Sequence, residues 1–575
     1  MIREMEIRLE VNGTEIIAEQ GETILNALSR NGMHVPTICN LKELSPTGAC
    51  RMCVVEVEGF ENLIPACSFP VEEPLKIRTH SPRVLRARKA NVELLLSSHP
   101  DDCLYCERNG SCELQSLAGE LNIRERRIPG RRRSRRVDRS SPAIVRDPSK
   151  CILCGRCVRI CEEIMATSTL DFARRGNALQ VSTSMAMAMD DSNCTACGQC
   201  LNACPTGALV ENIQFPGLEP LLDDPGTGVM VQITPAVAVS LGELLGYRPG
   251  TDLSHSIHAI LHRMGFDLIV ETSLGAEVMI LEQTAVFRER EDQQYPLITS
   301  SCPAWVQFCR MNYPELIPHL SPLRSPAQIT GTLMKTKFAE QLSGRKKSLV
   351  SVLVTSCTAD KREAKQSTLT PGGEPVIDFV LTVRELAKMI RLSGLDLEKL
   401  SSEENSISRM VAGTAGRLSA TAGGEAECTI RSIYRQETGR ELDPSKLQRF
   451  RIRKKFREAT LDTGKGSLAI GAVSGLSEAI TVIEEIRAGR IRLDLLEVMA
   501  CPEGCINGGG QPLRAGEDAI RSRTRAVYEM DNSAEIRTAH HSPAAGRLYE
   551  DFLGETGGKK SRSLFYNTFT ETGDR

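Results

Sequence analysis

Cysteines account for most of the chemistry that this sequence could perform. The chain of 575 residues contains 21 of them, and almost all stand in short-spaced groups. The N-terminus begins with the strand-like alternation Ile7-Arg8-Leu9-Glu10 and lacks the apolar stretch of a secretory signal. In a reducing compartment, clustered thiols are metal ligands rather than disulfide partners, although composition alone leaves a disulfide framework open. We therefore expect a cytoplasmic protein that binds metal through its cysteines.

The first group has wide and unequal spacing. Its members are Cys39, Cys50, Cys53 and Cys67. Four thiolates suit a [2Fe-2S] cluster, with the close pair on one tight loop and the outer ligands on other loops. The small residues before Cys50 would let backbone amides approach the sulfurs. A zinc site is the alternative, but this spacing is atypical of zinc ribbons.

A histidine precedes three cysteines in the second group. The set consists of His99, Cys103, Cys106 and Cys112. On chemistry alone it could equally hold zinc. Its place between other cluster motifs favours a [4Fe-4S] cluster with one imidazole ligand, which removes a negative charge and shifts the potential. A solvated His99 beside a cluster with three protein ligands is the remaining alternative.

The third group consists of two copies of the run Cys-x2-Cys-x2-Cys-x3-Cys. The copies are Cys151, Cys154, Cys157, Cys161 and then Cys194, Cys197, Cys200, Cys204. In two-cluster ferredoxins the fourth cysteine of each run ligates the other cluster. We therefore predict two [4Fe-4S] clusters. One would use Cys151, Cys154, Cys157 and Cys204, and the other Cys194, Cys197, Cys200 and Cys161.

The fourth group is scattered over the C-terminal half. Its members are Cys302, Cys357, Cys501 and Cys505. The last two lie in the segment 497–512, whose glycines permit close backbone approach, and a pair spaced i, i+4 can project toward one cofactor. Only Cys309 and Cys428 remain outside the groups, and we interpret them as ordinary small hydrophobic residues.

These groups must be positioned by several domains, since a domain usually contains ~100–200 residues. We expect a ferredoxin domain of the β-grasp type at 1–79, a one-His, three-Cys cluster domain at 80–120 and a two-cluster ferredoxin domain at 141–212. Alternating apolar strands and amphipathic helices indicate a two-lobed α/β catalytic domain at 225–513, followed by a helical tail at 514–575. The expected fold class is therefore multidomain, with α+β and α/β parts.

Two segments invite a more specific interpretation. The linker 121–140 contains eight arginines between residues 124 and 136 without interleaved aromatics. We interpret it as a solvated linker or a collar against neighbouring domains rather than as a nucleic-acid site. We expect 423–441 to form a surface helix.

Charge and hydropathy exclude other classes of function. The net charge of −2 gives the chain as a whole no preference for nucleic acid. No apolar run reaches the ~18 residues of a membrane span, and the longest candidate, 229–245, is interrupted by polar residues. We expect neither a nucleic-acid partner nor a membrane span.

The order of the modules resembles that of multi-cluster [FeFe]-hydrogenases over almost the full length. The first two modules are also shared with the large subunit of respiratory complex I, so they do not discriminate. The segment 497–512 does, because it is similar to the family's third signature almost residue for residue. The tail resembles the family's small-subunit segment.

The resemblance implies an H-cluster and its reaction. Cys302, Cys357, Cys501 and Cys505 would ligate its four-iron part. Cys505 would bridge to a two-iron subsite with CO, cyanide and a dithiolate, inserted by dedicated maturation proteins, and Met499 would pack against that subsite. The implied reaction is the reversible reduction of two protons to H2, in which the protein fixes the cofactor and routes electrons and protons.

The positions that relay protons in the family are altered here. The signature Thr-Ser-Cys-Cys-Pro-Gly-Trp has Ser301 in place of its first cysteine. Gln283 and Val286 stand where the family has two relay carboxylates, whereas Ser321 is retained. A hydroxyl ionises far less readily than a thiol, and valine cannot carry a proton. We expect altered proton delivery, with a conservative swap and a modest loss of rate as the alternative.

The second signature also departs from the family pattern Met-Pro-Cys-Thr-Ala-Lys-Lys-x-Glu. Asp360 replaces the first lysine, which usually donates to a cyanide, and an ionised carboxylate cannot donate. We hypothesise that Lys361 substitutes from the next position. Glu363 is retained, while Ala327 and Ser419 replace a usual Gln and Phe. Because all the ligand positions survive, we infer that the metal scaffold is in use with altered surroundings.

Three functions remain open from the sequence. The first is an H2-oxidising or H2-evolving subunit of a hetero-oligomer that exchanges electrons with ferredoxin or with an NAD(P)H-oxidising flavoprotein. The second is a slow, regulatory subunit that senses H2 or redox state, which the altered proton route favours. The third is a pure electron-transfer subunit that lacks the two-iron part of the active cluster.

Overall fold

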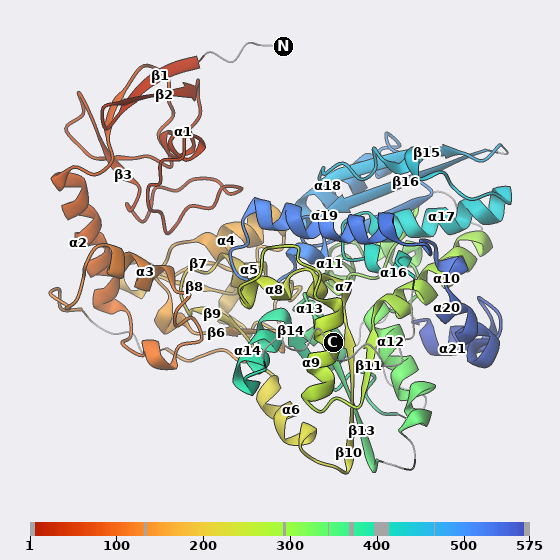
Figure 1. Ribbon diagram of the computed structural model, residues 1–575. Helices are drawn as coiled ribbons and strands as arrows, with labels where there is room; N and C mark the ends of the chain where they lie inside the picture. The colour runs from red at the N-terminus through yellow and green to blue at the C-terminus, as the bar shows by residue number, and fades with distance from the viewer. Residues whose placement is uncertain are drawn as a thin grey trace.

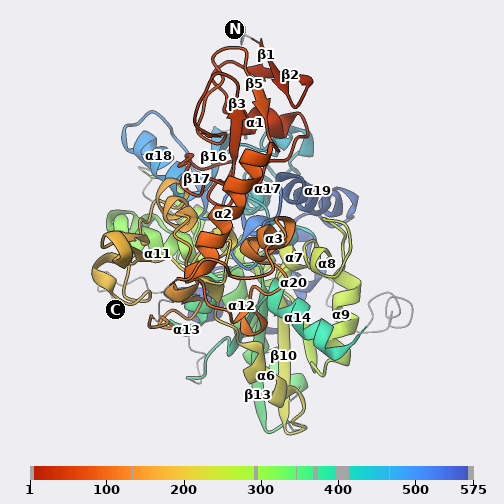
Figure 2. The same cartoon turned by 90° about the vertical axis from the view of Figure 1, so that its left-hand side faces the viewer.

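The computed structural model describes residues 6–130, 135–290, 295–342, 344, 346–366, 373–395, 413–464 and 466–567. Within these ranges, the N-terminal modules form an arm beside a larger two-lobed body (Figure 1). Figure 2 shows the first module standing above the rest, with the long helix α2 running down from it. Residues 131–134 of the basic linker, parts of the expected catalytic domain and the last residues of the tail lie outside the described ranges.

The first module is a five-stranded sheet covered by a short helix. The strand order is β2-β1-β5-β3-β4, with β1 antiparallel to β2 and parallel to β5. Ile7, Leu9 and Val11 of β1 are buried while Arg8 and Glu10 between them face solvent, as alternation in a strand requires. The elements are β1 (Glu6–Val11), β2 (Thr14–Glu19), α1 (Ile24–Arg30), β3 (Val54–Val57), β4 (Ile64–Pro65) and β5 (Lys76–Arg78).

The next two modules consist of cysteine loops between short elements. In the third module, the two cysteine runs adopt the same local form, since each leads into a short helix through a left-handed glycine, Gly155 or Gly198. Strands β6 and β9 pair antiparallel and hold the two runs together. The elements are α2 (Pro82–Ser98), α3 (Glu113–Glu120), β6 (Ile144–Arg146), α4 (Arg156–Arg159), β7 (Asp171–Ala173), β8 (Gln180–Ser182), α5 (Gln199–Ala203) and β9 (Leu209–Glu211).

The first lobe of the body is a parallel sheet with helices on both faces. Its order is β11-β10-β13-β14, and every residue of β10 is buried, which is typical of a central parallel strand. The strands are β10 (Thr227–Ile233), β11 (Leu268–Glu271), β13 (Ser348–Thr355) and β14 (Phe379–Thr382). The helices include α6 (Phe215–Leu222), α8 (Leu241–Leu244), α9 (Ser254–Arg263), α10 (Ser273–Glu289), α12 (Pro326–Lys335), α13 (Ala359–Lys365) and α14 (Val383–Ser393).

The second lobe contains the sheet β12-β17-β16-β15, in which only the β15–β16 hairpin is antiparallel. Its strands are β12 (Leu297–Ile298), β15 (Phe456–Asp462), β16 (Ser467–Ser474) and β17 (Leu495–Met499). Its helices are α11 (Pro303–Asn312), α16 (Ala415–Leu418), α17 (Gly424–Thr438) and α18 (Leu476–Arg487).

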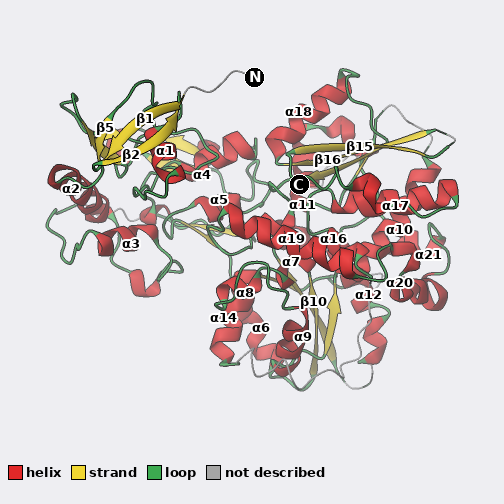
Figure 3. Cartoon of the chain, turned by 45° about the horizontal axis from the view of Figure 1, so that its top comes forward, coloured by secondary structure: helices red, strands yellow, loops and turns green. Residues whose placement is uncertain are grey.

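The C-terminal tail ties the two lobes together. Figure 3 shows α19 crossing the region between the two sheets. The fully buried Arg523 of α19 binds Glu243 of α8 at 2.6 Å and donates to the Ile506 carbonyl at 2.8 Å. Farther along, Glu282 of α10 accepts hydrogen bonds from the hydroxyls of Tyr549 and Tyr566. The tail elements are α19 (Glu517–Ser533), α20 (Pro543–Leu548) and α21 (Lys559–Phe565).

One expectation about the second lobe was wrong. The segment 423–441 is not a surface helix, because residues 424–434 of α17 are buried throughout. Ala426, Ile430 and Ile433 pack against Leu297 and Leu495 of the neighbouring sheet. Charged residues between these apolar positions suggested exposure, but their partners come from other parts of the fold: Glu427, for example, pairs with Arg451 at 2.7 Å.

Candidate cluster sites and active site

The four scattered cysteines meet between the two lobes. Three of them follow strands that pair in parallel with a neighbour: Cys302 follows β12, Cys357 follows β13 and Cys501 follows β17. Cys505 lies on the loop after β17. Loops after the carboxyl ends of parallel strands are where such sheets build their sites. The Ala500 amide donates to the Cys302 sulfur at 3.5 Å, so the two strands of the second lobe bring their loops together.

Burial and mutual proximity govern the chemistry of these four thiols. Burial first, and then the charges of Cys302 and Cys501, raise the pKa of Cys505 well above its usual range. Burial, and then the charge of Cys302, raise the pKa of Cys501 to about 12. Four thiols gathered where no single one would ionise alone are a donor set for a soft metal centre, which deprotonates them on binding.

The glycine-containing loop after Cys501 brings its backbone close to the four thiols. A Cβ at Gly504 would lie 2.7 Å from the Met499 sulfur and from the Ala422 amide, so only glycine fits there. Met499 is buried, with its thioether beside the loop that carries Cys501 and Cys505. The donor set and this close cradle therefore fit the H-cluster that the sequence resemblance implies.

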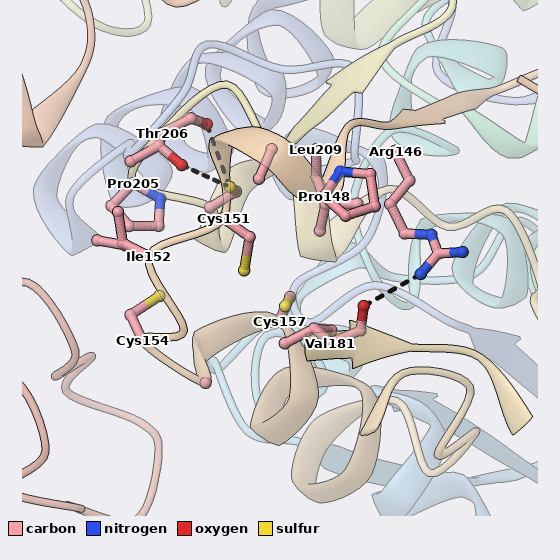
Figure 4. Close-up of a pocket in the computed structure, with 13 residues that line it drawn as sticks. Arg146, Pro148, Cys151, Ile152, Cys154, Cys157, Val181, Pro205, Thr206 and Leu209 are labelled. Atoms are coloured by element: carbon pink, nitrogen blue, oxygen red, sulfur yellow. Dashed lines mark hydrogen bonds between the residues drawn. The ribbon is translucent and has the colours of Figure 1, made fainter. Parts of the chain in front are cut away.

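The two cysteine runs of the third module interleave in the crossed arrangement expected from their spacing. Cys151, Cys154 and Cys157 line one pocket together with Cys204 of the second run (Figure 4). The Cys204 thiol donates to the Thr206 carbonyl at 3.1 Å. The remaining four thiols form the other set: burial and then the charges of Cys161, Cys197 and Cys194 raise the pKa of Cys200 well above its usual range.

His99 of the second group is buried at the end of α2. Its Nδ1 lies 3.0 Å from the Pro100 carbonyl, while its buried Nε2 has no hydrogen-bond partner among the described residues. A proton on Nδ1 leaves the Nε2 lone pair free, as in metal-bound histidines. Burial lowers the pKa of His99, which favours this neutral form. Cys112 follows Cys103 and Cys106, and burial followed by the charges of both raises its pKa.

The first group lies on the loops of the first module as two neighbouring pairs. A hydrogen bond from the Cys50 thiol lowers the pKa of Cys39, and one from Cys53 lowers the pKa of Cys67. Backbone amides of the small residues before Cys50 also donate to the outer sulfurs. The four thiols are therefore assembled with amide donors around them, as a [2Fe-2S] centre requires.

The altered relay positions form neutral contacts. The Ser321 hydroxyl donates to the Gln283 side-chain oxygen at 2.6 Å, and the Gln283 amide nitrogen has no hydrogen-bond partner among the described residues. Val286 packs against an apolar cluster of the second lobe. The Ser301 hydroxyl instead donates to Glu425 at the start of α17. Glu425 was not among the expected site residues, because its segment has the sequence pattern of a surface helix.

The charged residues after Cys357 face different partners. Asp360 accepts a hydrogen bond from Thr355 at 2.7 Å, and burial raises its pKa to about 6. Lys361 is fully buried and binds Glu385 and the Asn212 carbonyl, each at 2.6 Å. Its ammonium is thus held away from the cysteine set, contrary to the hypothesis that it replaces the missing lysine. Glu363 accepts from Ser325 at 2.9 Å, and burial raises its pKa to about 8.

The third module contacts the catalytic loops directly. Gln199 donates to the Asn507 carbonyl at 2.8 Å, and Asn202 donates to the Gly508 carbonyl at 3.3 Å. The charge of Cys501 contributes to raising the pKa of Cys197 after burial, so the two cysteine sets are electrostatic neighbours. Fold and site together define a multi-cluster iron–sulfur oxidoreductase whose electron-transfer modules end at a buried catalytic set.

Comparison with known protein families identifies which kind of iron–sulfur oxidoreductase the chain resembles. Residues 227–509 match the family described as iron only hydrogenase large subunit, C-terminal domain. The other matches are a 2Fe-2S iron-sulfur cluster binding domain (4–82), an NADH-ubiquinone oxidoreductase-G iron-sulfur binding region (88–127), a 4Fe-4S dicluster domain (133–208) and an iron hydrogenase small subunit (517–571).

Individual relatives extend over nearly the whole chain. NADP-reducing hydrogenase subunit HndD of Solidesulfovibrio fructosivorans is 36% identical, with 98% of each chain covered. Iron hydrogenase 1 of Clostridium pasteurianum is 30% identical, with 97% of this chain and 98% of that protein covered. A solved structure of [FeFe]-hydrogenase HydA1 from Chlamydomonas reinhardtii matches with a TM-score of 0.55 and 27% identity over 62% of this chain and 98% of that one.

The chain belongs to the [FeFe]-hydrogenase family. It is a hydrogenase that interconverts H2 with protons and electrons through an iron–sulfur relay. The expected modules, with [2Fe-2S] and [4Fe-4S] domains before an H-cluster domain, are confirmed. In the part of the chain that the structure describes, no helix is both long and apolar enough to cross a membrane.

Proposed function

We propose that this chain is the hydrogen-activating subunit of a complex that oxidises H2 and reduces a nicotinamide nucleotide through a flavoprotein partner. H2 yields two protons and two electrons, and the nucleotide takes up both electrons with one proton. The observation that carries the proposal is the similarity to an NADP-reducing hydrogenase subunit over 98% of both chains. A shorter match adds support: 177 residues, or 31% of this chain and 21% of the other protein, are 37% identical to an NADPH-Fe(3+) oxidoreductase subunit alpha of Geobacter sulfurreducens.

The cysteine groups would bind five metal centres. We propose a [2Fe-2S] cluster on Cys39, Cys50, Cys53 and Cys67. Three [4Fe-4S] clusters would use His99, Cys103, Cys106 and Cys112; Cys151, Cys154, Cys157 and Cys204; and Cys161, Cys194, Cys197 and Cys200. The H-cluster would use Cys302, Cys357, Cys501 and Cys505. The partnerless Nε2 of His99 and the pocket shared by Cys151 and Cys204 support these sets.

Direct contacts between modules support a continuous electron route. Arg159 of α4 donates to the carbonyls of Cys39 and Ser45, and Glu163 accepts from the Ser45 amide at 2.8 Å. The second module reaches the same domain, since the Glu113 amide donates to the Pro205 carbonyl at 3.0 Å. The first two modules therefore both rest on the third, which contacts the catalytic loops. Electron transfer would enter or leave the catalytic set through the third module.

The residues of the catalytic cradle would position the cofactor and exclude water. When bound, the H-cluster supplies the chemistry of H2 cleavage and formation. Cys302, Cys357, Cys501 and Cys505 would hold it, and Met499 would cover it with an apolar thioether. The buried Asp360 bears no donor when ionised, so this chain offers a different hydrogen-bonding environment from the family's lysine. We propose that this substitution alters the properties of the bound cofactor.

A slow, H2-sensing role is the second candidate. It is favoured by the neutral contacts at Gln283 and Val286, where the family has relay carboxylates. A sensor needs binding of H2 and a change of redox state but no rapid turnover, so loss of a fast proton route would be tolerated.

The test uses the maturated protein and its native complex. H2-dependent reduction of NADP+ and NAD+ is measured on the complex isolated through a tag on this chain, and ferredoxin reduction is measured on the chain alone. Nucleotide reduction by the complex is expected. Ferredoxin reduction with no nucleotide reduction would contradict the proposed acceptor. H2 turnover far below that of ordinary members in every assay would favour the sensing role, and absence of CO and cyanide infrared bands would favour the electron-transfer alternative.

A further inference from the structure

The usual positions for proton relay cannot serve Ser301 in this chain. Gln283 is not a proton acceptor at neutral pH, and its contact with Ser321 is an ordinary neutral hydrogen bond. Val286 is apolar and packs against the second lobe. A hydrogenase must nevertheless bring two protons to its active site for each H2 formed. A different titratable group is therefore needed near Ser301.

Glu425 is such a group. Its Oε2 accepts the hydrogen bond of the Ser301 hydroxyl, across 124 residues of sequence. The side chain is buried, and its other oxygen, Oε1, has no hydrogen-bond partner among the described residues. One oxygen of this buried carboxyl is bonded to the Ser301 hydroxyl, and the other has no partner in the part of the chain that the structure describes. Burying a carboxylate in this way costs free energy, so such a group is usually protonated or functional.

A second carboxyl lies directly behind the first. Glu497 of β17 accepts hydrogen bonds from the amides of Gly423 and Ala426, at 2.8 and 2.7 Å, and so holds the turn that presents Glu425. Burial, and then the charge of Glu497, raise the pKa of Glu425 to about 8. Burial raises the pKa of Glu497 to about 7. Both carboxyls thus exchange protons near neutral pH, which suits proton transfer.

Charged groups lead outward from this pair. The positive charge of Arg457 on β15 lowers the pKa of Glu497 against the effect of burial. Arg457 in turn lies 3.5 Å from Glu503, which also pairs with Arg453 at 3.1 Å. Glu503, on the loop between Cys501 and Cys505, is only partly buried, so these charged groups connect the carboxyl pair with a partly exposed part of the second lobe.

We propose that Glu425 passes protons to and from Ser301, with Glu497 as the next carboxyl outward, in place of the route that Gln283 and Val286 interrupt. During H2 formation the Glu425 acid gives its proton to the Ser301 oxygen while the serine's own proton moves inward. Glu497 then reprotonates the Glu425 carboxylate. H2 oxidation uses the same steps in reverse, and the electrons leave through the cysteine sets. The proposal rests on the hydrogenase reaction and not on the identity of the electron acceptor.

The first test does not require turnover. Protein produced without the maturation proteins is titrated while the infrared band of a protonated carboxyl is followed. Glu363 also has a pKa of about 8, so the carboxyl amplitude that titrates near pH 8 should include both groups in the wild type, fall to the Glu363 component in Glu425→Gln and stay unchanged in Glu277→Gln. Glu277 is the matched control, because it is another buried glutamate bonded to a serine, Ser542, at 2.5 Å, but lies outside the site. An undiminished amplitude near pH 8 in Glu425→Gln would overturn the proposal.

The second test measures turnover in maturated protein. Glu425→Gln should lower kcat for H2 evolution by at least about 100-fold, the lower limit for a positioned proton donor, with little change in KM for the electron donor. Glu277→Gln should keep wild-type kcat. Adding Ser301→Cys, Gln283→Glu and Val286→Glu to Glu425→Gln should restore turnover by rebuilding the family's route, which a folding defect would not allow. An unchanged kcat in Glu425→Gln, or an equal loss in Glu277→Gln, would overturn the proposal.

Wild-type protein without any H2 turnover would count against the catalytic function and not against proton exchange at Glu425, which the infrared titration decides by itself.

Discussion

The Thr358 hydroxyl donates a hydrogen bond to the Ala196 carbonyl at 2.7 Å, and this contact joins the electron-transfer and catalytic halves of the chain. Thr358 directly follows Cys357, and Ala196 directly precedes Cys197. Both residues are buried, with Thr358 fully inaccessible to solvent. The contact therefore fixes two loops that each carry a proposed cluster ligand, and the distance between their clusters depends on it.

Replacing Thr358 with valine should loosen this junction. The change keeps the shape but leaves the Ala196 carbonyl without its donor, at a cost of about 1–3 kcal/mol in the free energy of unfolding. We also expect slower reduction of the N-terminal clusters by H2, followed by stopped-flow absorbance. Thr460→Val on the exposed side of β15 is the control and should change neither quantity. Unaltered stability and cluster reduction in Thr358→Val would show that the junction does not depend on this bond.

His99 should determine both the occupancy and the potential of the second cluster. His99→Ala removes the free Nε2, so we expect loss of iron or a three-ligand cluster. His99→Cys adds a negative thiolate and should lower the reduction potential while four irons are kept. Iron analysis and redox titration by electron paramagnetic resonance measure both effects. A solvated His99 predicts identical spectra for all three proteins, and zinc in place of iron would contradict the cluster assignment.

Lys361 should act on stability and not on the cofactor. It forms a buried ion pair with Glu385, in which both side chains are fully inaccessible. Lys361→Met leaves the Glu385 charge unpaired and should lower the free energy of unfolding by about 3–5 kcal/mol. Adding Glu385→Gln should recover most of that loss. In the double variant we expect unshifted CO and cyanide infrared bands. A shift of the cyanide bands would instead show that Lys361 interacts with the cofactor.

Glu277 should make stability depend on pH between about 4.5 and 7. Burial raises its pKa to about 7, against the hydrogen bond from Ser542, so the folded protein holds this proton more tightly than the unfolded chain does. The resulting stabilisation is fully present below the unfolded pKa of about 4.5 and is lost as pH rises through 7; it amounts to at most about 3 kcal/mol. Denaturant unfolding of wild type and Glu277→Gln over this range measures it. Parallel pH curves for the two proteins would refute the assignment.

The sequence by itself determined the cysteine groups and the order of the modules. Proposed ligand sets such as Cys151, Cys154 and Cys157 are local, because one short loop positions all three sulfurs, and spacing alone therefore indicates the chemistry. The crossed partner Cys204 followed from the repeat of the same run. The sequence also showed that Ser301, Gln283 and Val286 differ from the family's proton-relay residues. It did not show which residue carries protons instead.

The tertiary structure decided which residues replace those functions. Glu425 is 124 positions from Ser301, and its segment alternates charged and apolar residues like an exposed helix. Packing of α17 between the second sheet, α10 and the tail buries that helix and turns its first carboxyl toward the site. The direction of Lys361 was likewise fixed by Glu385, a partner on another helix. Spacing identifies ligands that share a loop, whereas contacts between distant segments depend on how helices and sheets pack together.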